Sequence, residues 1–79
     1  MRIISQSGRI DIPYEVAVVY VEYESIIAKV GDERYVMGEY LTEEKAIEVM
    51  EHLRRSYYLR GERYEFEKDY FWLPAEKEV

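Results

Sequence analysis

Cysteine is absent from this chain of 79 residues, which also holds only two prolines and four glycines. Without cysteine the protein forms neither a disulfide nor a thiolate metal site. A domain of this size buries only about 60 % of the surface that its unfolded chain exposes, and small domains commonly compensate with a disulfide, a metal or a second subunit. The remaining sources of stability for this chain are close packing and self-association, and we expect a homo-oligomer.

Excess positive charge and long apolar runs are missing as well. The net charge is −6, from 17 acidic and 11 basic side chains. Such a surface repels phosphate backbones and anionic lipid, which argues against a nucleic-acid-binding or membrane-binding protein. No stretch approaches the roughly 20 apolar residues of a membrane helix, and the first residues do not resemble a signal peptide. We therefore expect a cytoplasmic protein.

The residues that usually carry chemistry are few and scattered. His52 is the single histidine, and it lacks a serine, a second histidine or a cysteine at motif spacing, so we interpret it as a solvated helix residue. Glu22 and Glu24 share one strand face, and Glu15 precedes the strand. Paired carboxylates can act in acid–base catalysis or bind a cation, but carboxylates at a strand end ordinarily face water. No glycine lies in a phosphate-binding loop or dinucleotide motif. We expect no enzyme, no metal and no cofactor.

Apolar alternation and turn residues predict an all-antiparallel set of strands. Residues 2–5 and 9–12 flank a Ser-Gly turn and should form a hairpin that Pro13 ends. Residues 16–21 are β-prone or small without a polar interruption, which favours a central strand covered on both faces. The remaining strands are expected at residues 25–30, 34–40 and 64–73.

One helix is predicted between Thr42 and Gly61. Thr42 is a good N-cap, acidic residues follow in the first turn, and glycine is a common C-terminal stop. The apolar stripe at helical spacing comprises Ala46, Val49, Met50, Leu53 and Tyr57. We therefore predict a single α+β domain over residues 1–74, with an antiparallel sheet of about four to six strands and one helix packed on one face. A charged C-terminal tail, residues 75–79, completes the chain.

Two groups of residues are candidates for binding. The one basic concentration is Arg54, Arg55, Arg60 and Arg63. Arginine forks onto phosphates and carboxylates, so these side chains together with the stacking ring of Trp72 are a candidate anion or nucleotide site. Charge matching at the end of the helix is the simpler explanation. The second group consists of aromatic residues, which are more numerous than one small core can bury, so we expect some in the core and others at an interface. They are Tyr57, Tyr58, Tyr70, Phe71 and Trp72.

Four short segments of this chain, residues 2–8, 11–15, 42–46 and 71–74, carry the pattern R-[IV]-I-S-Q-x-G, D-[IV]-P-Y-E, T-E-x-K-A and aromatic–x–x–Pro. With this pattern the chain resembles short proteins encoded by phages and prophages of Firmicutes. Many relatives have Asp after the Ser-Gln, where this chain has the neutral turn residue Ser7. The resemblance covers most of the chain and implies a phage or mobile-element accessory protein without assigning an activity.

Two functions follow as hypotheses. The first is a non-enzymatic protein of phage or prophage origin that binds and blocks a host protein, such as a component of host defence. The alternative is an oligomeric sponge that sequesters a nucleotide-type signalling molecule, with arginines on the phosphate and an aromatic ring on the base. Both rest on analogy with small phage proteins that act stoichiometrically.

Overall fold

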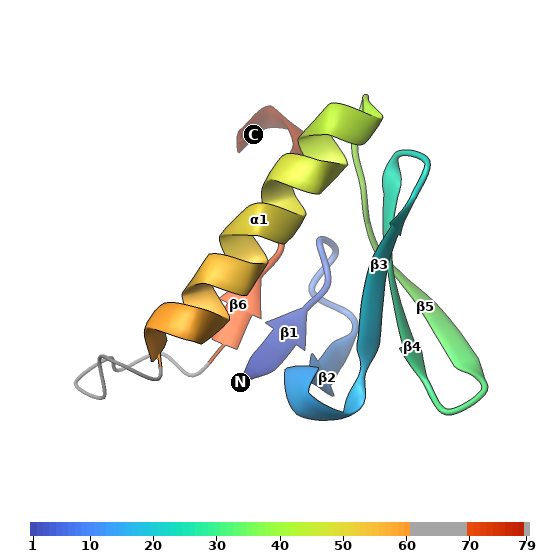
Figure 1. The fold of residues 1–79 in the computed structure, drawn as a ribbon. Coiled ribbons are helices and arrows are strands. Elements are labelled where there is room, and N and C mark those ends of the chain that lie inside the picture. Colours follow the sequence, from blue (N-terminus) through green and yellow to red (C-terminus); the bar gives the residue numbers. More distant parts are fainter. Residues whose placement is uncertain (61–69, 79) are drawn as a thin grey trace.

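The computed structural model describes residues 1–60 and 70–78 (Figure 1). These residues form six strands and one α-helix, and over them the α+β class, the number of strands and the single helix are confirmed. The elements are β1 (Arg2–Ile4), β2 (Asp11–Pro13), the 3-10 turn η1 (Tyr14–Val16), β3 (Val18–Glu22), β4 (Ser25–Val30), β5 (Glu33–Glu39), α1 (Glu43–Arg60), β6 (Tyr70–Trp72) and the 3-10 turn η2 (Glu76–Glu78).

The strands form two small sheets instead of one. In the first, β1 pairs antiparallel with β2, as the predicted hairpin requires, and parallel with β6 on its other side. In the second, β3, β4 and β5 form an antiparallel meander. Pro13 ends β2 and the η1 turn redirects the chain, so β3 starts a separate sheet. Of the strand predicted at residues 64–73, β6 lies within the described residues and residues 64–69 lie outside them.

The expectation that residues 16–21 form a central strand covered on both faces is wrong. They contribute β3, an edge strand of the meander, and Val18 there is 64 % exposed. The central strand is β4, whose Ile26, Ile27 and Ala28 are all buried. An apolar run indicates β-propensity, but the two tight turns of a meander place its middle strand at the centre.

One long side chain crosses the outer face of the meander. Arg34 on β5 donates hydrogen bonds to the Tyr20 hydroxyl at 3.0 Å and to the Glu22 carboxylate at 3.0 and 3.1 Å, both on β3. These hydrogen bonds raise the pKa of Arg34, with the Tyr20 hydroxyl as the largest cause. Because β4 lies between β3 and β5, the Arg34 side chain must cross it, and we infer that it covers Ile27, which is 3 % exposed.

Helix α1 covers the inner faces of both sheets (Figure 1). Thr42 is confirmed as its N-cap, because the Thr42 hydroxyl accepts a hydrogen bond from the Lys45 amide at 3.2 Å. Four residues of the predicted stripe are buried, and Tyr57 is partly exposed at the helix end. The core cluster between helix and sheets is Met1, Ile3, Ile26, Ala28, Met37, Tyr40, Ala46, Val49, Met50, Leu53 and Leu73.

A seam of hydrogen bonds joins the two sheets and the chain after β6. A β-bulge at Met37 interrupts the β4–β5 ladder, and the Met37 carbonyl accepts a hydrogen bond from the Gln6 amide at 2.7 Å. The Gln6 side chain then donates to the carbonyls of Glu39 and Pro74 and accepts from the Glu39 amide, all at 3.1 to 3.2 Å. The Tyr40 hydroxyl donates to the Pro74 carbonyl at 2.8 Å. The seam therefore fixes the position of the chain beyond β6.

Candidate functional site

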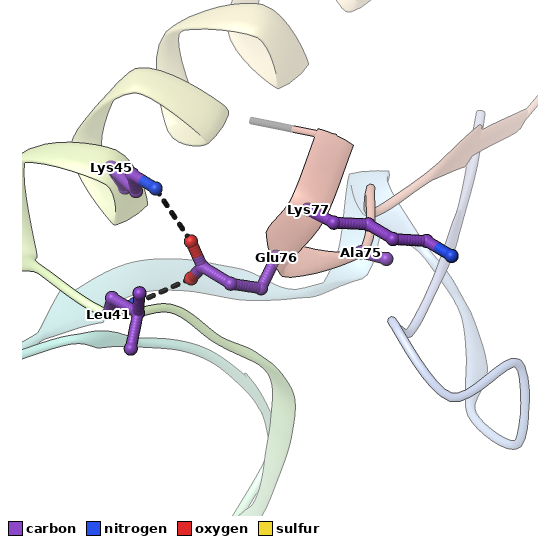
Figure 2. A pocket seen from close by; sticks show the side chains of 5 residues that line it. All are labelled: Leu41, Lys45, Ala75, Glu76 and Lys77. Atoms are coloured by element: carbon purple, nitrogen blue, oxygen red, sulfur yellow. Dashed lines mark hydrogen bonds and ion pairs between the residues drawn. The ribbon is translucent and has the colours of Figure 1, made fainter.

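Two shallow hollows adjoin at Ala75, next to the seam. We call them the Leu41 hollow, with a volume of about 520 Å³, and the Trp72 hollow, with about 510 Å³. Together they form the Trp72–Leu41 surface. The Leu41 hollow is lined by Leu41, Lys45, Ala75, Glu76 and Lys77 (Figure 2), and the Trp72 hollow by Gln6, Trp72, Leu73, Pro74 and Ala75.

Trp72 reaches this surface because side chains alternate along β6. Phe71 packs against the core, so its neighbours Tyr70 and Trp72 point to the opposite face of the sheet. Trp72 is 54 % exposed, and its ring lies directly against the backbone of Gly8. A Cβ built on Gly8 would stand 2.9 Å from Cζ2 of the indole, and the Gly8 φ of +80° also disfavours any side chain.

The loop beneath the Trp72 ring is held by its own hydrogen bonds. Ser5 is buried, and its hydroxyl accepts from the Ile10 amide at 3.1 Å while its carbonyl accepts from the Gly8 amide at 2.9 Å. The Ser7 hydroxyl accepts from the Arg9 amide at 3.2 Å. The half-exposed indole of Trp72 therefore rests on a loop whose conformation is held by these hydrogen bonds.

The Leu41 hollow is built around a carboxylate. Glu76 accepts a hydrogen bond from the Leu41 amide at 2.5 Å and one from the Lys45 ammonium at 2.8 Å (Figure 2). The Lys45 hydrogen bond is the main cause that lowers the pKa of Glu76, the Leu41 amide adds to it, and partial desolvation opposes both. The Leu41 side chain stays 72 % exposed beside this pair, and Lys77 extends from η2 away from Lys45.

The predicted arginine site is described in part. Arg54 is exposed and pairs with Glu51 one turn earlier, and Arg55 is exposed as well. Arg60 is the last residue of α1, and its side chain and all of Arg63 lie outside the described residues. An anion site at this end of the helix therefore stays a prediction.

Trp72 does not join the described arginines. The helix that carries Arg54 and Arg55 packs on the same face of the sheet as Phe71, whereas Trp72 occupies the other face. A single site that combines these two arginines with the Trp72 ring would have to reach around the sheet.

The predicted interface aromatics are distributed over several surfaces. Phe71 packs against the core, and Tyr70 and Trp72 lie on the outer face of the sheet. Tyr57 packs against Tyr14 of η1, with ring centroids 4.7 Å apart and planes tilted by 52°. Its neighbour Tyr58 is exposed on the helix surface.

The other titratable residues singled out in the sequence are either exposed to solvent or bound to another residue of the chain. His52 is exposed on α1, Glu22 binds Arg34, and Glu15 accepts a hydrogen bond from the Met1 ammonium at 2.5 Å. Within residues 1–60 and 70–78, no group of three or more histidine and carboxylate side chains is arranged to hold a metal ion.

Sequence reasoning missed Leu41 as a surface residue. Leu41 directly precedes the N-cap Thr42, where an apolar side chain commonly packs back onto the first helical turns as a hydrophobic staple. In this structure the Leu41 amide instead donates a hydrogen bond to the Glu76 carboxylate, and the Leu41 side chain is exposed to solvent. The sequence holds no local signal for this exposure, because Ala75 and Glu76, which lie beside Leu41, are 34 and 35 positions further along the chain.

Comparisons with protein-family models, with curated proteins and with solved structures find no match to this chain. Over the part of the chain that the structure describes, no helix has the length and apolar character needed to span a membrane.

Proposed function

We propose that this chain is a non-enzymatic binding protein that uses the Trp72–Leu41 surface to occupy, and thereby block, a surface of another protein. The carrying observation is the half-exposed Trp72 ring fixed against Gly8. Tryptophan is prominent among the residues that dominate binding energy at protein interfaces. A ring that is already positioned loses little conformational freedom on binding, and this favours affinity.

The setting of this proposal comes from the sequence. The resemblance to phage and prophage proteins of Firmicutes suggests a protein of the host cytoplasm as the target, such as a component of host defence. Self-association also remains a prediction, which light scattering of the purified protein would check.

The nucleotide-sponge alternative receives less support from the described residues. Within one subunit Trp72 lies on the opposite side of the sheet from Arg54 and Arg55, so these groups would meet one ligand only across a subunit interface. The measurement that would favour the sponge is a rise in Tm with a cyclic nucleotide that is abolished by replacing Arg54 and Arg55.

The proposal is tested by capture of host proteins on three immobilised forms of the chain. These are the unmodified protein, Trp72→Ala, and the matched control Val18→Ala, which removes another exposed apolar side chain from the edge strand β3. We expect the same partner on the unmodified protein and on Val18→Ala, and an affinity at least tenfold lower on Trp72→Ala. Equal capture by folded Trp72→Ala protein would contradict a role for this surface.

A further inference from the structure

Among the strands that the structure describes, β3 is the longest edge strand without an obstruction. The edge strands β2 and β6 are three residues long, and β2 ends at Pro13. The outer edge of β5 is interrupted by the bulge at Met37 and bound by Gln6 at Met37 and Glu39. In contrast, the five residues of β3 include no bulge, proline or lysine, which commonly protect an edge strand from pairing. Its first residue, Val18, is 64 % exposed.

The open edge of β3 presents the backbone groups of Val19 and Val21. A two-residue turn joins β3 to β4, so Glu22 and Ser25, which flank this turn, form a hydrogen-bonded pair. Hydrogen-bonded and non-hydrogen-bonded pairs alternate along an antiparallel ladder. The amides and carbonyls of Val19 and Val21 therefore point away from β4, and no hydrogen bond from another described segment reaches them.

We propose that two copies of this chain pair antiparallel through β3, with a two-fold axis at Tyr20, so that their two meanders form one six-stranded sheet. In this register Val19 of each copy lies opposite Val21 of the other. Each such pair exchanges two hydrogen bonds and symmetry repeats the pair, so all the outward backbone groups of these residues are satisfied. This inference goes beyond the proposed function, because it concerns a different surface.

The side chains of β3 are complementary to themselves in this register. Val19 and Val21 pack against the core on the inner face, so their pairing across the axis extends an apolar surface. Tyr20 lies on the outer face, where its hydroxyl binds Arg34. The two Tyr20 residues meet at the axis as a non-hydrogen-bonded pair, the position in which opposite side chains come closest.

Charge complementarity at the ends of the pairing favours a second copy of the chain as the occupant. Val18 lies opposite Glu22 of the second copy on the outer face, and Lys29 of β4 lies beside Val18. Lys29 is exposed and forms no ion pair with another described residue. Glu22 of the second copy is two strands away from Lys29, a spacing that Arg34 also spans to reach Glu22 of its own chain. The Lys29 side chain thus covers Val18 and meets a carboxylate beyond it.

The pairing is tested by sedimentation equilibrium over a concentration series, which separates a monomer of 9.6 kDa from a dimer of twice that mass. The charge variant Val18→Glu places a carboxylate opposite Glu22 of the second copy. Its matched control, Val36→Glu, adds the same charge at an exposed valine of the other edge strand, β5. Circular dichroism checks that each variant is folded.

We expect the unmodified chain to dimerise and Val36→Glu to keep its dissociation constant within twofold. In Val18→Glu the constant should rise at least tenfold, because symmetry introduces the repulsion with Glu22 twice. Val18→Lys, which faces the same carboxylate with the opposite charge, should change it less than threefold. Val18→Ala keeps every backbone group and adds no charge, so it should retain the dimer and remains a suitable control for host-protein capture.

Amide hydrogen exchange locates the interface within the dimer. The amides of Val19 and Val21 should exchange slowly at high protein concentration and faster on dilution or in Val18→Glu. A chain that stays monomeric up to about 1 mM would overturn the inference. So would a dimer that leaves these two amides unprotected, or one that Val18→Glu and Val36→Glu weaken equally. None of these outcomes bears on the proposed function, which fails only when the captured host protein binds Trp72→Ala as well as the unmodified chain.

Discussion

Replacing Gly8 by alanine tests the contact that holds the Trp72 ring, and Gly31 supplies a matched control. Both glycines have a left-handed backbone, with φ of +80° at Gly8 and +61° at Gly31. A Cβ at Gly8 would lie 2.9 Å from the indole, whereas a Cβ at Gly31 would meet nothing within 4 Å. The two substitutions therefore share the backbone penalty and differ in the contact with Trp72.

The backbone penalty for alanine in this conformation is about 1–2 kcal/mol. Forcing extra atoms into a filled space adds about 1–3 kcal/mol, and we expect the low end at Gly8 because the half-exposed Trp72 ring can swing outward. Gly31→Ala should thus lose about 1–2 kcal/mol and Gly8→Ala about 2–4 kcal/mol of unfolding free energy by these two terms.

Urea unfolding measures these losses, and tryptophan fluorescence locates their cause. In Gly8→Ala we expect red-shifted emission and easier quenching by iodide, because the ring leaves its support, and we expect neither change in Gly31→Ala. Equal losses of stability together with identical emission would refute the contact between Trp72 and Gly8 and weaken the case for a fixed binding surface.

Three further substitutions test the seam, the Leu41 hollow and the cover of the meander. Gln6→Ala removes three hydrogen bonds worth about 0.5–1.5 kcal/mol each, so urea unfolding should show a loss of about 1.5–3 kcal/mol because Gln6 is partly exposed; Gln6→Glu, which turns a carboxylate oxygen toward the Glu39 and Pro74 carbonyls, should lose no less. The pKa of Glu76 lies below its ordinary value of 4.5, so its stabilisation is present above pH 4.5 and lost as pH falls through the lower folded value; the Tm difference from Glu76→Gln should therefore shrink below that pH, and a constant difference would contradict the pairing. Arg34→Ala should destabilise more than Arg34→Met, because methionine keeps an apolar cover over Ile27, and equal losses in thermal unfolding would show that the polar contacts dominate.

Local features of the sequence predicted the helix and the hairpins well. Thr42 begins the helix because a hydroxyl there binds a free amide of the first turn, and this signal spans only three residues. The turn at Gly31 and the pairing of β1 with β2 are likewise short-range. The arrangement of the strands was harder, because whether β3 lies at an edge or at the centre depends on its partners and not on its own residues.

The candidate site depends on contacts that no sequence window contains. Gln6 binds Pro74 across 68 positions, and Glu76 binds the Leu41 amide across 35. The parallel pairing of β6 with β1 is of the same kind, since it brings Trp72 beside the loop that holds Gly8. Sequence reasoning did select Trp72 from its residue type, but the partners that fix its position follow from the tertiary fold.

The four sequence segments on which the proposed phage origin rests consist largely of residues that hold the two sheets, the helix and the chain ends together. In the first segment, the Ser5 hydroxyl and Gly8 shape the loop, and Gln6 joins the sheets. In the second, the Glu15 carboxylate binds the Met1 ammonium.

The later segments have the same structural character. Thr42 caps the helix and Lys45 binds Glu76, while the carbonyl of Pro74 accepts hydrogen bonds from two side chains. These contacts lie within the chain and stabilise its fold.

The residues that would meet a partner occupy different positions. Trp72 stands at an unspecified position of the aromatic–x–x–Pro segment, and Leu41 lies between segments. Because binding energy concentrates in a few exposed side chains, specificity changes when they change and the scaffold does not. A chain with the same pattern but another residue in place of Trp72 should therefore adopt this fold and bind a different target.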